Sequence, residues 1–202
     1  MLIDRHRAAP FRKPFADYNV AAFAASMKRR EERAPDAPLI LDAGCGVGAS
    51  SIALALAFPG HYVIGVDQSA SRLSRNIAGK MQMPANVDLV RADLVDFWRL
   101  LREAGVRLDR HYLLYPNPWP KVGQLARRWH GHAVFPALLE LGGRLECRSN
   151  WPIYIDEFAF ALERLTTQAV VCEAYLPEVA LTPFERKYLE SGHRLHRASV
   201  SL

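Results

Sequence analysis

The sequence predicts an α/β fold in which a mostly parallel β-sheet carries helices on both faces. Apolar runs alternate with helical patterns from residue 38 onward, and this alternation implies right-handed crossovers between parallel strands. A polar residue ends each of the first five apolar runs: Asp42, Asp67, Asp93, Asn117 and Asn150. Sheets of this kind bind ligands outside the carboxyl ends of their strands. We therefore expect one site along that edge.

The apolar runs predict strands at 38–42, 61–67, 87–92, 110–116, 144–149 and 168–175, and a last alternating segment at 193–201. Helices are expected at 17–33, 50–58, 69–80, 94–104, 124–141, 152–165 and 183–191, several of them bounded by a capping residue or a glycine. The chain of 202 residues suits one domain. We expect residues 1–34 to form a basic N-terminal arm with a helix, and residues 35–202 to form the domain that holds the site.

The positive charge of the chain is concentrated near its start. The net charge is +5, and residues 1–33 contain eight Lys or Arg against four acids. A basic arm strengthens nucleic-acid binding by neutralising phosphates. A solvated tail and helix face would have the same composition, so both interpretations stay open.

Other features of the sequence exclude some classes of protein. No run of eighteen apolar residues is present, and the first residues are charged where a secretory signal needs an apolar core. Cys45, Cys147 and Cys172 are an odd set without metal-binding spacing. We therefore expect no membrane association, no metal site and reduced thiols in a cytoplasmic protein.

The segment LILDAGCGVGASS, residues 39–51, carries the clearest chemical signal. Gly44, Gly46 and Gly48 permit a sharp turn and a close approach to a ligand at a helix N-terminus. Asp67, at the end of the next apolar run, is placed to hold a ribose diol, although it is also a candidate helix cap beside Ser69. Ala49 occupies the third position of a dinucleotide fingerprint, which leaves NAD open.

An acid before the glycines, as in D-A-G-C-G-V-G, resembles motif I of the class I S-adenosylmethionine (SAM) methyltransferases. This resemblance implies a Rossmann-like seven-stranded sheet and SAM as the cofactor. Asp42 and the three glycines would hold its amino-acid end, Asp67 its ribose, and Asp93 with Leu94 its adenine. Asp93 is equally placed to cap the helix 94–104.

The segment LLYPNPWPK, residues 113–121, lies where a methyl acceptor would bind. Its three prolines stiffen the backbone beyond the fourth strand. Asn117 would present an amide there, Trp119 a stacking surface and Lys121 a cation for phosphate. The alternative is a rigid turn with Trp119 in the core.

This segment resembles the P-D-P-W-P-K motif of the tRNA (guanine-N7)-methyltransferases, and so does the late T-x-x-E at Thr182–Glu185. The resemblance implies methyl transfer from SAM to N7 of a guanine in tRNA. It places Asn117 and Asn150 as catalytic residues and implies a set of acceptor contacts: Asn117, Trp119, Lys121, Arg127, Arg128, Asn150, Thr182 and Glu185. The sequence T-P-F-E is also a capping box with proline at the first helical position.

The chain departs from that family pattern at the acceptor side. Asn117 stands where the family has aspartate, Ser149-Asn150 replaces Thr-Asp, and the basic stretch is reduced to Arg127, Arg128 and His130. Guanine N7 is a bare lone pair, so no general base is needed. Neutral amides would nevertheless read the base more weakly than carboxylates.

These departures leave two other hypotheses open. Asn117-Pro118-Trp119 resembles the Asn-Pro-Pro-Tyr motif of amino-methyltransferases, which implies an exocyclic amine or another non-tRNA acceptor. A SAM- or RNA-binding protein with impaired catalysis is the second alternative. The sequence does not define the oligomeric state.

Overall fold

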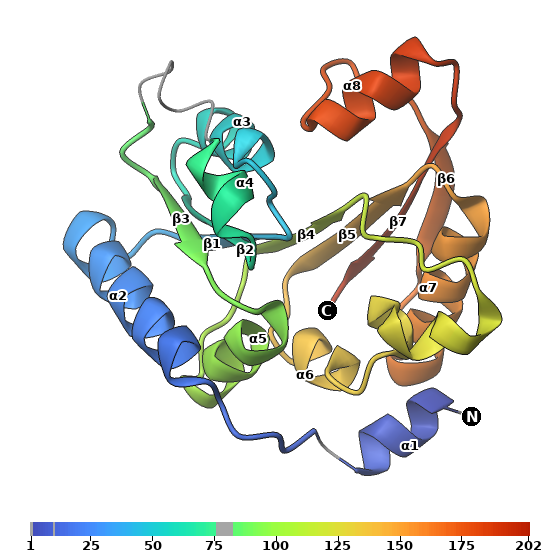
Figure 1. Cartoon of the computed structure of the whole chain (residues 1–202), viewed down its shortest axis with the longest axis horizontal. Helices are drawn as coiled ribbons and strands as arrows, with labels where there is room; N and C mark the ends of the chain where they lie inside the picture. Colours follow the sequence, from blue (N-terminus) through green and yellow to red (C-terminus); the bar gives the residue numbers. More distant parts are fainter. Residues whose placement is uncertain (1, 10, 76–82) are drawn as a thin grey trace.

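The computed structural model describes residues 2–9, 11–75 and 83–202. Its centre is a seven-stranded sheet in the order β3-β2-β1-β4-β5-β7-β6 (Figure 1). The strands are β1 (Leu39–Ala43), β2 (Tyr62–Asp67), β3 (Val87–Arg91), β4 (Arg110–Leu114), β5 (Arg144–Ser149), β6 (Val171–Tyr175) and β7 (Leu195–Ser201). The first five run parallel, and β7 runs antiparallel between β5 and β6. The predicted α/β fold with a mostly parallel, seven-stranded sheet is confirmed.

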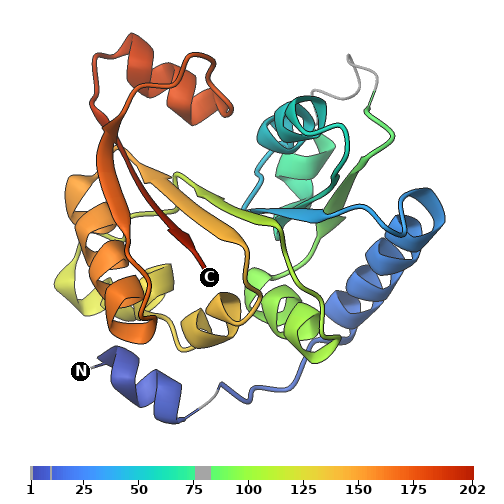
Figure 2. The ribbon, with the colours of Figure 1, turned by 180° about the vertical axis from the view of Figure 1, so that it is seen from behind.

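Helices cover both faces of this sheet (Figures 1 and 2). The described helices are α1 (Leu2–Ala8), α2 (Asp17–Arg33), α3 (Ala49–Ala57), α4 (Ala70–Ser74), α5 (Leu94–Glu103), α6 (Phe135–Leu139), α7 (Pro152–Leu165) and α8 (Pro183–Glu190). Figure 1 shows α3 and α4 on one side of the sheet and α2, α5 and α6 on the other.

Alternation along the strands builds a core on each face. In β1, Leu39 and Leu41 join the large cluster with Phe97 and Phe158, whereas Ile40 joins a smaller cluster that includes Leu54 of α3. Every residue of β1 and β2 is buried, as expected for central strands of a parallel sheet with both faces covered. The parallel register of β1 and β2 brings their last residues to the same edge of the sheet.

The predicted helix 124–141 is wrong. The segment instead forms two short 3₁₀ turns, η2 (Val122–Arg127) and η3 (Trp129–Gly131), followed by α6. Gly131 lies so close to the Leu125 carbonyl that a Cβ could not fit there, and Pro136 restarts the helix at its first turn. The apolar residues of 124–141 are spaced as in a helix, but they belong to two turns and a short helix.

Several boundaries also differ from the sequence-based prediction. The fourth strand ends at Leu114, before Tyr115 takes a left-handed φ of 53°. The helix predicted at 69–80 is seen as α4, and residues 76–80 of that prediction lie outside the described residues. The N-terminal arm contains a helix that the sequence did not indicate, α1, in which Ile3 is buried and Asp4 pairs with Arg164 of α7. Whether 1–34 and 35–202 are separate units stays a prediction.

Candidate functional site

The five polar strand ends lie along one edge of the sheet. Asp42 and Asp67 belong to β1 and β2, and Asp93, Asn117 and Asn150 follow β3, β4 and β5. Because these five strands are parallel neighbours, their carboxyl ends meet at the same edge. The register of the antiparallel pair also brings the start of β7 beside Ser149, so α8, which precedes β7, lies near this edge. The arrangement has the position expected of a ligand site.

The loop between β1 and α3 turns through three glycines with positive φ. Gly44, Gly46 and Gly48 have φ values of 83°, 61° and 81°. A Cβ on Gly46 would meet no atom within 4 Å, whereas one on Gly48 would come to 2.6 Å from Leu89. Gly46 thus faces open space for a ligand, and Gly48 allows α3 to pack on the sheet. Burial raises the pKa of Cys45 well above its usual value, so this thiol is inert.

Asp42 lies behind this loop. Its carboxylate is 1% exposed and accepts hydrogen bonds from the hydroxyls of Ser50 and Ser51 at 2.6 and 2.7 Å. Burial raises its pKa, although the two hydroxyls oppose that shift. Gly65 of β2 permits the arrangement, because a Cβ there would collide with the Ser51 hydroxyl. In this structure the carboxylate fixes the start of α3.

Asp67 connects β2 to the glycine loop. Its Oδ2 accepts from the Gly46 amide at 3.0 Å and from the Arg72 guanidinium at 3.1 Å, and its Oδ1 accepts from the Ser69 amide at 2.8 Å. Ser69 itself caps α4, accepting from the Arg72 amide at 3.3 Å, so the helix does not depend on Asp67 for its cap. The Arg72 side chain is 58% exposed and the Asp67 side chain is 3% exposed, so this pair joins a buried carboxylate to a guanidinium that faces solvent.

Asp93 caps α5, as the alternative interpretation of this residue expected. Its Oδ1 accepts from the Val95 amide at 2.8 Å. Asn19 of α2 accepts from the Asp93 amide at 2.9 Å and donates to the buried Asp96 at 2.7 Å. Leu94, the next residue, lies beside the glycine loop, 4.0 Å from the position of a Cβ on Gly44. The N-terminal helix thus holds the corner predicted to meet adenine.

The proline-rich turn after β4 has two residues in unusual backbone conformations. Tyr115 and Trp119 have φ values of 53° and 44°, a region that non-glycine residues seldom adopt. Asn117 is exposed, and its side-chain oxygen accepts from the Trp119 amide at 3.2 Å. Trp119 is half-buried and Lys121 is exposed. Strained residues persist where the surrounding structure holds them, frequently at functional sites.

The three remaining basic residues after this turn differ in role. Arg127 is exposed and its guanidinium stacks over the Trp119 ring at 4.9 Å. Arg128 is 6% exposed, pairs with Glu157 and donates to the Trp119 carbonyl at 3.1 Å. His130 is also buried against Glu157, and burial lowers its pKa to about 4. Arg127 is thus the exposed member of the three.

Thr182 caps α8, as the capping-box interpretation expected, but Glu185 reaches the amide one residue before the N-cap and not that of Thr182. The Thr182 hydroxyl accepts from the Glu185 amide at 2.9 Å, and Glu185 Oε2 accepts from the Leu181 amide at 2.6 Å. Glu185 is fully buried, and its Oε1 accepts from Tyr115 and Arg148. Asn150 is half-buried between Ser149 and Trp151. The acceptor roles of these residues stay predictions.

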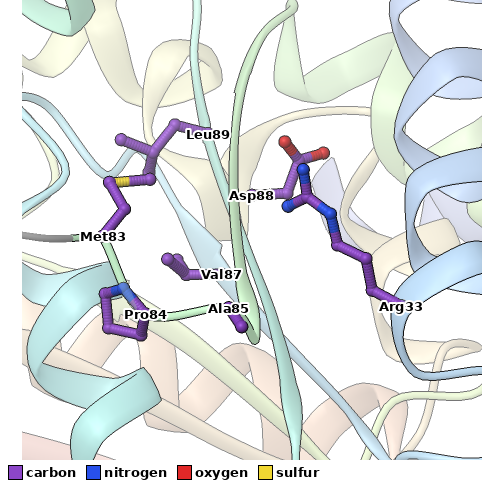
Figure 3. Close-up of a pocket in the computed structure, with 7 residues that line it drawn as sticks. All are labelled: Arg33, Met83, Pro84, Ala85, Val87, Asp88 and Leu89. Carbon is purple, nitrogen blue, oxygen red and sulfur yellow. The ribbon is translucent and has the colours of Figure 1, made fainter.

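A separate pocket lies at the outer edge of the sheet. It has a volume of about 510 Å³ and is lined by residues of α2, β3 and the segment before β3, namely Arg33, Met83, Pro84, Ala85, Val87, Asp88 and Leu89 (Figure 3). Figure 3 shows Arg33 extending towards Asp88 on one side and Met83 lying on the other. None of the predicted site residues lines it.

Several residues that build the site were missed in the sequence. Ser50 and Ser51 follow the glycine loop and look like ordinary residues of the first helical turn, although two hydroxyls eight and nine residues after an acid at a strand end were a signal. Asn19 and Arg148 act over distances in the chain that no local pattern reveals, whereas Arg72 lies only five residues after Asp67. Each of them contacts a predicted residue or its neighbour.

Comparison with known proteins is consistent with this geometry. The model of a family described as "Putative methyltransferase" matches residues 36–198. A relative from Halorhodospira halophila (strain DSM 244 / SL1), named tRNA (guanine-N(7)-)-methyltransferase, is 29% identical over 79% of this chain and 73% of its own length. A relative of the same name from Burkholderia mallei (strain ATCC 23344) is 28% identical over 78% of this chain and 62% of its own length. The chain thus spans less than two thirds of the second relative.

Solved structures share the fold. The 16S rRNA methyltransferase KamB has a TM-score of 0.66 at 17% identity, and the match covers 94% of this chain and 95% of KamB. The antibiotic-resistance methyltransferase Kmr has a TM-score of 0.56 at 19% identity over 89% and 92% of the two chains. At these identities the likeness extends to the fold alone.

Proposed function

Because the chain belongs to the methyltransferase family whose model matches residues 36–198, we propose that it transfers a methyl group from SAM to N7 of a guanine in tRNA. The relatives named tRNA (guanine-N(7)-)-methyltransferase support this acceptor. The observation that carries the proposal is the common edge of the sheet, where a glycine loop and an Asp67 carboxylate stand beside the PNPWPK turn. The protein would then act in the cytoplasm, where tRNA is processed.

The residues at β1 and β2 fit SAM. Open space beside Gly46 admits a ligand, and the Asp67 carboxylate retains acceptor capacity for a ribose hydroxyl once Arg72 withdraws. Gly44 and Gly48 would complete the loop around the amino-acid end. Asp42 would contribute through the serines that fix α3, and its negative charge lies behind the loop that faces a cationic ligand.

The corner after β3 would hold the adenine. Leu94 lies against the glycine loop and would contact the flat face of the base. Asp93 uses Oδ1 for the α5 cap, so its Oδ2 is the atom proposed to accept from the adenine amine. Bound SAM supplies an electrophilic methyl group on a sulfonium, and no further cofactor is required.

On the acceptor side, the chain would orient the base. Guanine N7 carries an exposed lone pair, so neither Asn117 nor Asn150 needs to remove a proton. Their amide oxygens would accept from the N1–H and the exocyclic amine of guanine, with Thr182 beside them at the start of α8. Alignment of a nucleophile with its target is worth up to about 7–11 kcal/mol in favourable cases. Catalysis by positioning therefore suffices.

Three other side chains suit contacts to RNA outside the reacting base. Arg127 stacks on Trp119, and this exposed pair offers both a flat surface and a charge. Lys121 is exposed next to the same turn and would bind a phosphate. The family resemblance implies an acceptor contact for Arg128, but in this chain it would act by holding the Trp119 carbonyl in place.

The proposal is tested with methyl-labelled SAM and separate acceptors: tRNA that lacks N7-methylguanosine, ribosomal RNA, and protein. Transfer to tRNA alone supports the proposed acceptor class. Transfer to ribosomal RNA or protein alone would reject tRNA and retain the methyltransferase reaction. SAM binding in calorimetry without transfer to any acceptor would reject the proposed catalysis.

A further inference from the structure

A half-buried tyrosine and a buried arginine precede the two candidate acceptor amides with the same spacing. Tyr115 lies two residues before Asn117, and Arg148 lies two residues before Asn150. Both donate to the same atom, Glu185 Oε1, the Tyr115 hydroxyl at 2.8 Å and the Arg148 guanidinium at 3.0 Å. One carboxylate oxygen thus joins the end of β4 to the end of β5, from a residue that lies 70 positions after Tyr115 and 37 after Arg148 in the chain.

The Glu185 carboxylate is not placed to touch a substrate. Its residue has 0% exposure, and its second oxygen accepts from the Leu181 amide at 2.6 Å. The carboxylate therefore accepts from three donors in three segments, namely Tyr115, Arg148 and Leu181. Both of its oxygens, which a bound base would need as acceptors, are already in use. A base contact would require several of these buried hydrogen bonds to break, which is costly.

Both partners of Glu185 are themselves held firmly. The Tyr115 amide donates to the Arg148 carbonyl at 2.9 Å, so the two residues are joined by backbone as well as through Glu185. Arg148 also donates to Glu146 at 2.6 Å, and its guanidinium lies 4.4 Å from the centre of the Tyr175 ring. Burial and the neighbouring Glu185 raise the pKa of Tyr115, so its hydroxyl remains a donor.

The backbone conformation of Tyr115 indicates how its hydrogen bond to Glu185 affects the position of Asn117. Its φ of 53° turns the chain away from β4 and into the proline-rich turn that presents Asn117. A bulky residue seldom adopts this conformation unless its side chain is anchored. The hydrogen bond to Glu185 is that anchor, and the Arg148 contact supplies the fixed point on the neighbouring strand.

We propose that Glu185 is a positioning residue that sets the spacing of Asn117 and Asn150 through Tyr115 and Arg148, and does not itself bind the acceptor base. The proposal rests on the proposed function, because the two amides are taken to read the guanine. It differs from the role that the family resemblance implies for Glu185, which is an acceptor contact. In this chain the T-P-F-E segment is the support of the acceptor site.

The test compares Glu185→Gln, Tyr115→Phe and the double variant with the wild type. Tyr188→Phe is the matched control, since Tyr188 lies on α8 beside the Tyr115 ring and its hydroxyl joins no hydrogen bond among the described residues. We expect each single variant to lower kcat/KM for tRNA by about 10- to 100-fold, because small displacements of positioning groups have effects of that size. The Kd for SAM should change by less than about twofold, since the cofactor contacts are separate.

The double variant distinguishes positioning from direct contact. If Glu185 acts through Tyr115, the double variant loses no more activity than the more damaged single variant. If Glu185 binds the base itself, Tyr115→Phe leaves kcat/KM near the wild-type value and the two losses multiply in the double variant. The second result would overturn the proposal.

A second readout does not depend on methyl transfer. The side-chain amide signals of Asn117 and Asn150 are assigned by NMR from Asn117→Asp and Asn150→Asp variants. Glu185→Gln and Tyr115→Phe should each shift both amide signals, and Tyr188→Phe should shift neither. Unshifted amides in a folded Glu185→Gln variant would contradict the proposal. A wild type that methylates no tRNA would overturn the proposed function alone, since the amide signals still report the spacing.

Discussion

Single side chains at the proposed cofactor end of the site already hold parts of the fold together. Asp67 accepts a hydrogen bond from the Gly46 amide, which shapes the glycine loop, and another from the exposed Arg72 guanidinium, the position proposed for a ribose hydroxyl. Asp42 is different, since its carboxylate is enclosed by Ser50 and Ser51. We therefore expect the two acids to contribute unequally: Asp67 by contact with the cofactor, as proposed, and Asp42 through the start of α3.

Replacement of Asp67 by Ala should weaken SAM binding by about 10- to 100-fold, because a hydrogen bond to a charged group contributes about 1.5–3 kcal/mol. Isothermal titration calorimetry measures the change. Asp109→Ala is the control, since Asp109 precedes β4 at the opposite edge and pairs with His61. Unchanged affinity in the Asp67 variant would show that the ribose does not bind at this carboxylate.

Replacement of Asn117 by Asp should raise kcat/KM for tRNA by about tenfold, because charge-assisted hydrogen bonds are about twice as strong as neutral ones. The new carboxylate retains an oxygen for the Trp119 amide, so the turn is preserved. Gln168→Glu makes the same change of charge on an exposed residue between α7 and β6 and should leave the rate unaltered. No gain in the Asn117 variant would mean that the acceptor is read by other groups.

At the scale of elements, α2 and α5 together build the corner proposed to hold the adenine. Asn19 joins the Asp93 amide to the buried Asp96, so the N-terminal helix is part of the site's support. Asp93 caps α5 in the same place. The proposed adenine contact would use the Asp93 oxygen that the cap leaves free of the Val95 amide, so substitution can separate the two roles.

Asp93→Ala should lower the free energy of unfolding by about 1 kcal/mol through loss of the cap, and Asp93→Ser should restore most of it. Both variants should bind SAM more weakly, because neither offers a carboxylate to the adenine amine. Urea unfolding and calorimetry measure the two effects on the same samples. Full SAM affinity in Asp93→Ser would leave Asp93 with the capping role alone.

Elements with strong local signals were predictable from the sequence, and those shaped by distant contacts were not. The glycine loop and the T-P-F-E cap follow from backbone rules that act over a few residues. The segment 124–141 has a helical apolar pattern, yet buried Arg128 turns towards Glu157 and the Trp119 carbonyl, and the helix is broken. In that segment, tertiary hydrogen bonds outweighed the helical periodicity of the apolar residues. Hydrogen bonds with residues distant in the chain also hold Glu185 in its buried position.

On the scale of the molecule, the parallel order of β1 to β5 gathers the chemistry at one edge. Among the residues that the structure describes, no helix is long and apolar enough to cross a membrane. Some of the basic side chains of the N-terminal arm make contacts within the fold, since Arg29 pairs with Asp88 and Arg30 donates to the Ala37 carbonyl. Arg12 and Lys13 remain exposed. A share of the arm's charge is thus available to an anionic partner.

The double variant Arg12→Ala/Lys13→Ala should weaken tRNA binding and reduce the slope of log K against log salt by about 1.5, because each phosphate contact contributes about 0.7–0.9. Filter binding at several salt concentrations measures the slope. Lys28→Ala is the control, since Lys28 is already paired with Glu32 on α2 at 3.8 Å. An unaltered slope in the double variant would mean that these two residues of the arm are solvated and do not contact the phosphates of tRNA.

The most direct test of the proposed function identifies the atom that receives the methyl group. The protein is incubated with methyl-labelled SAM and tRNA that lacks N7-methylguanosine, and the digested nucleosides are separated by mass spectrometry. We predict label in N7-methylguanosine, which would show that amides at positions 117 and 150 suffice for this reaction. Label on an exocyclic amine, or none despite bound SAM, would contradict it.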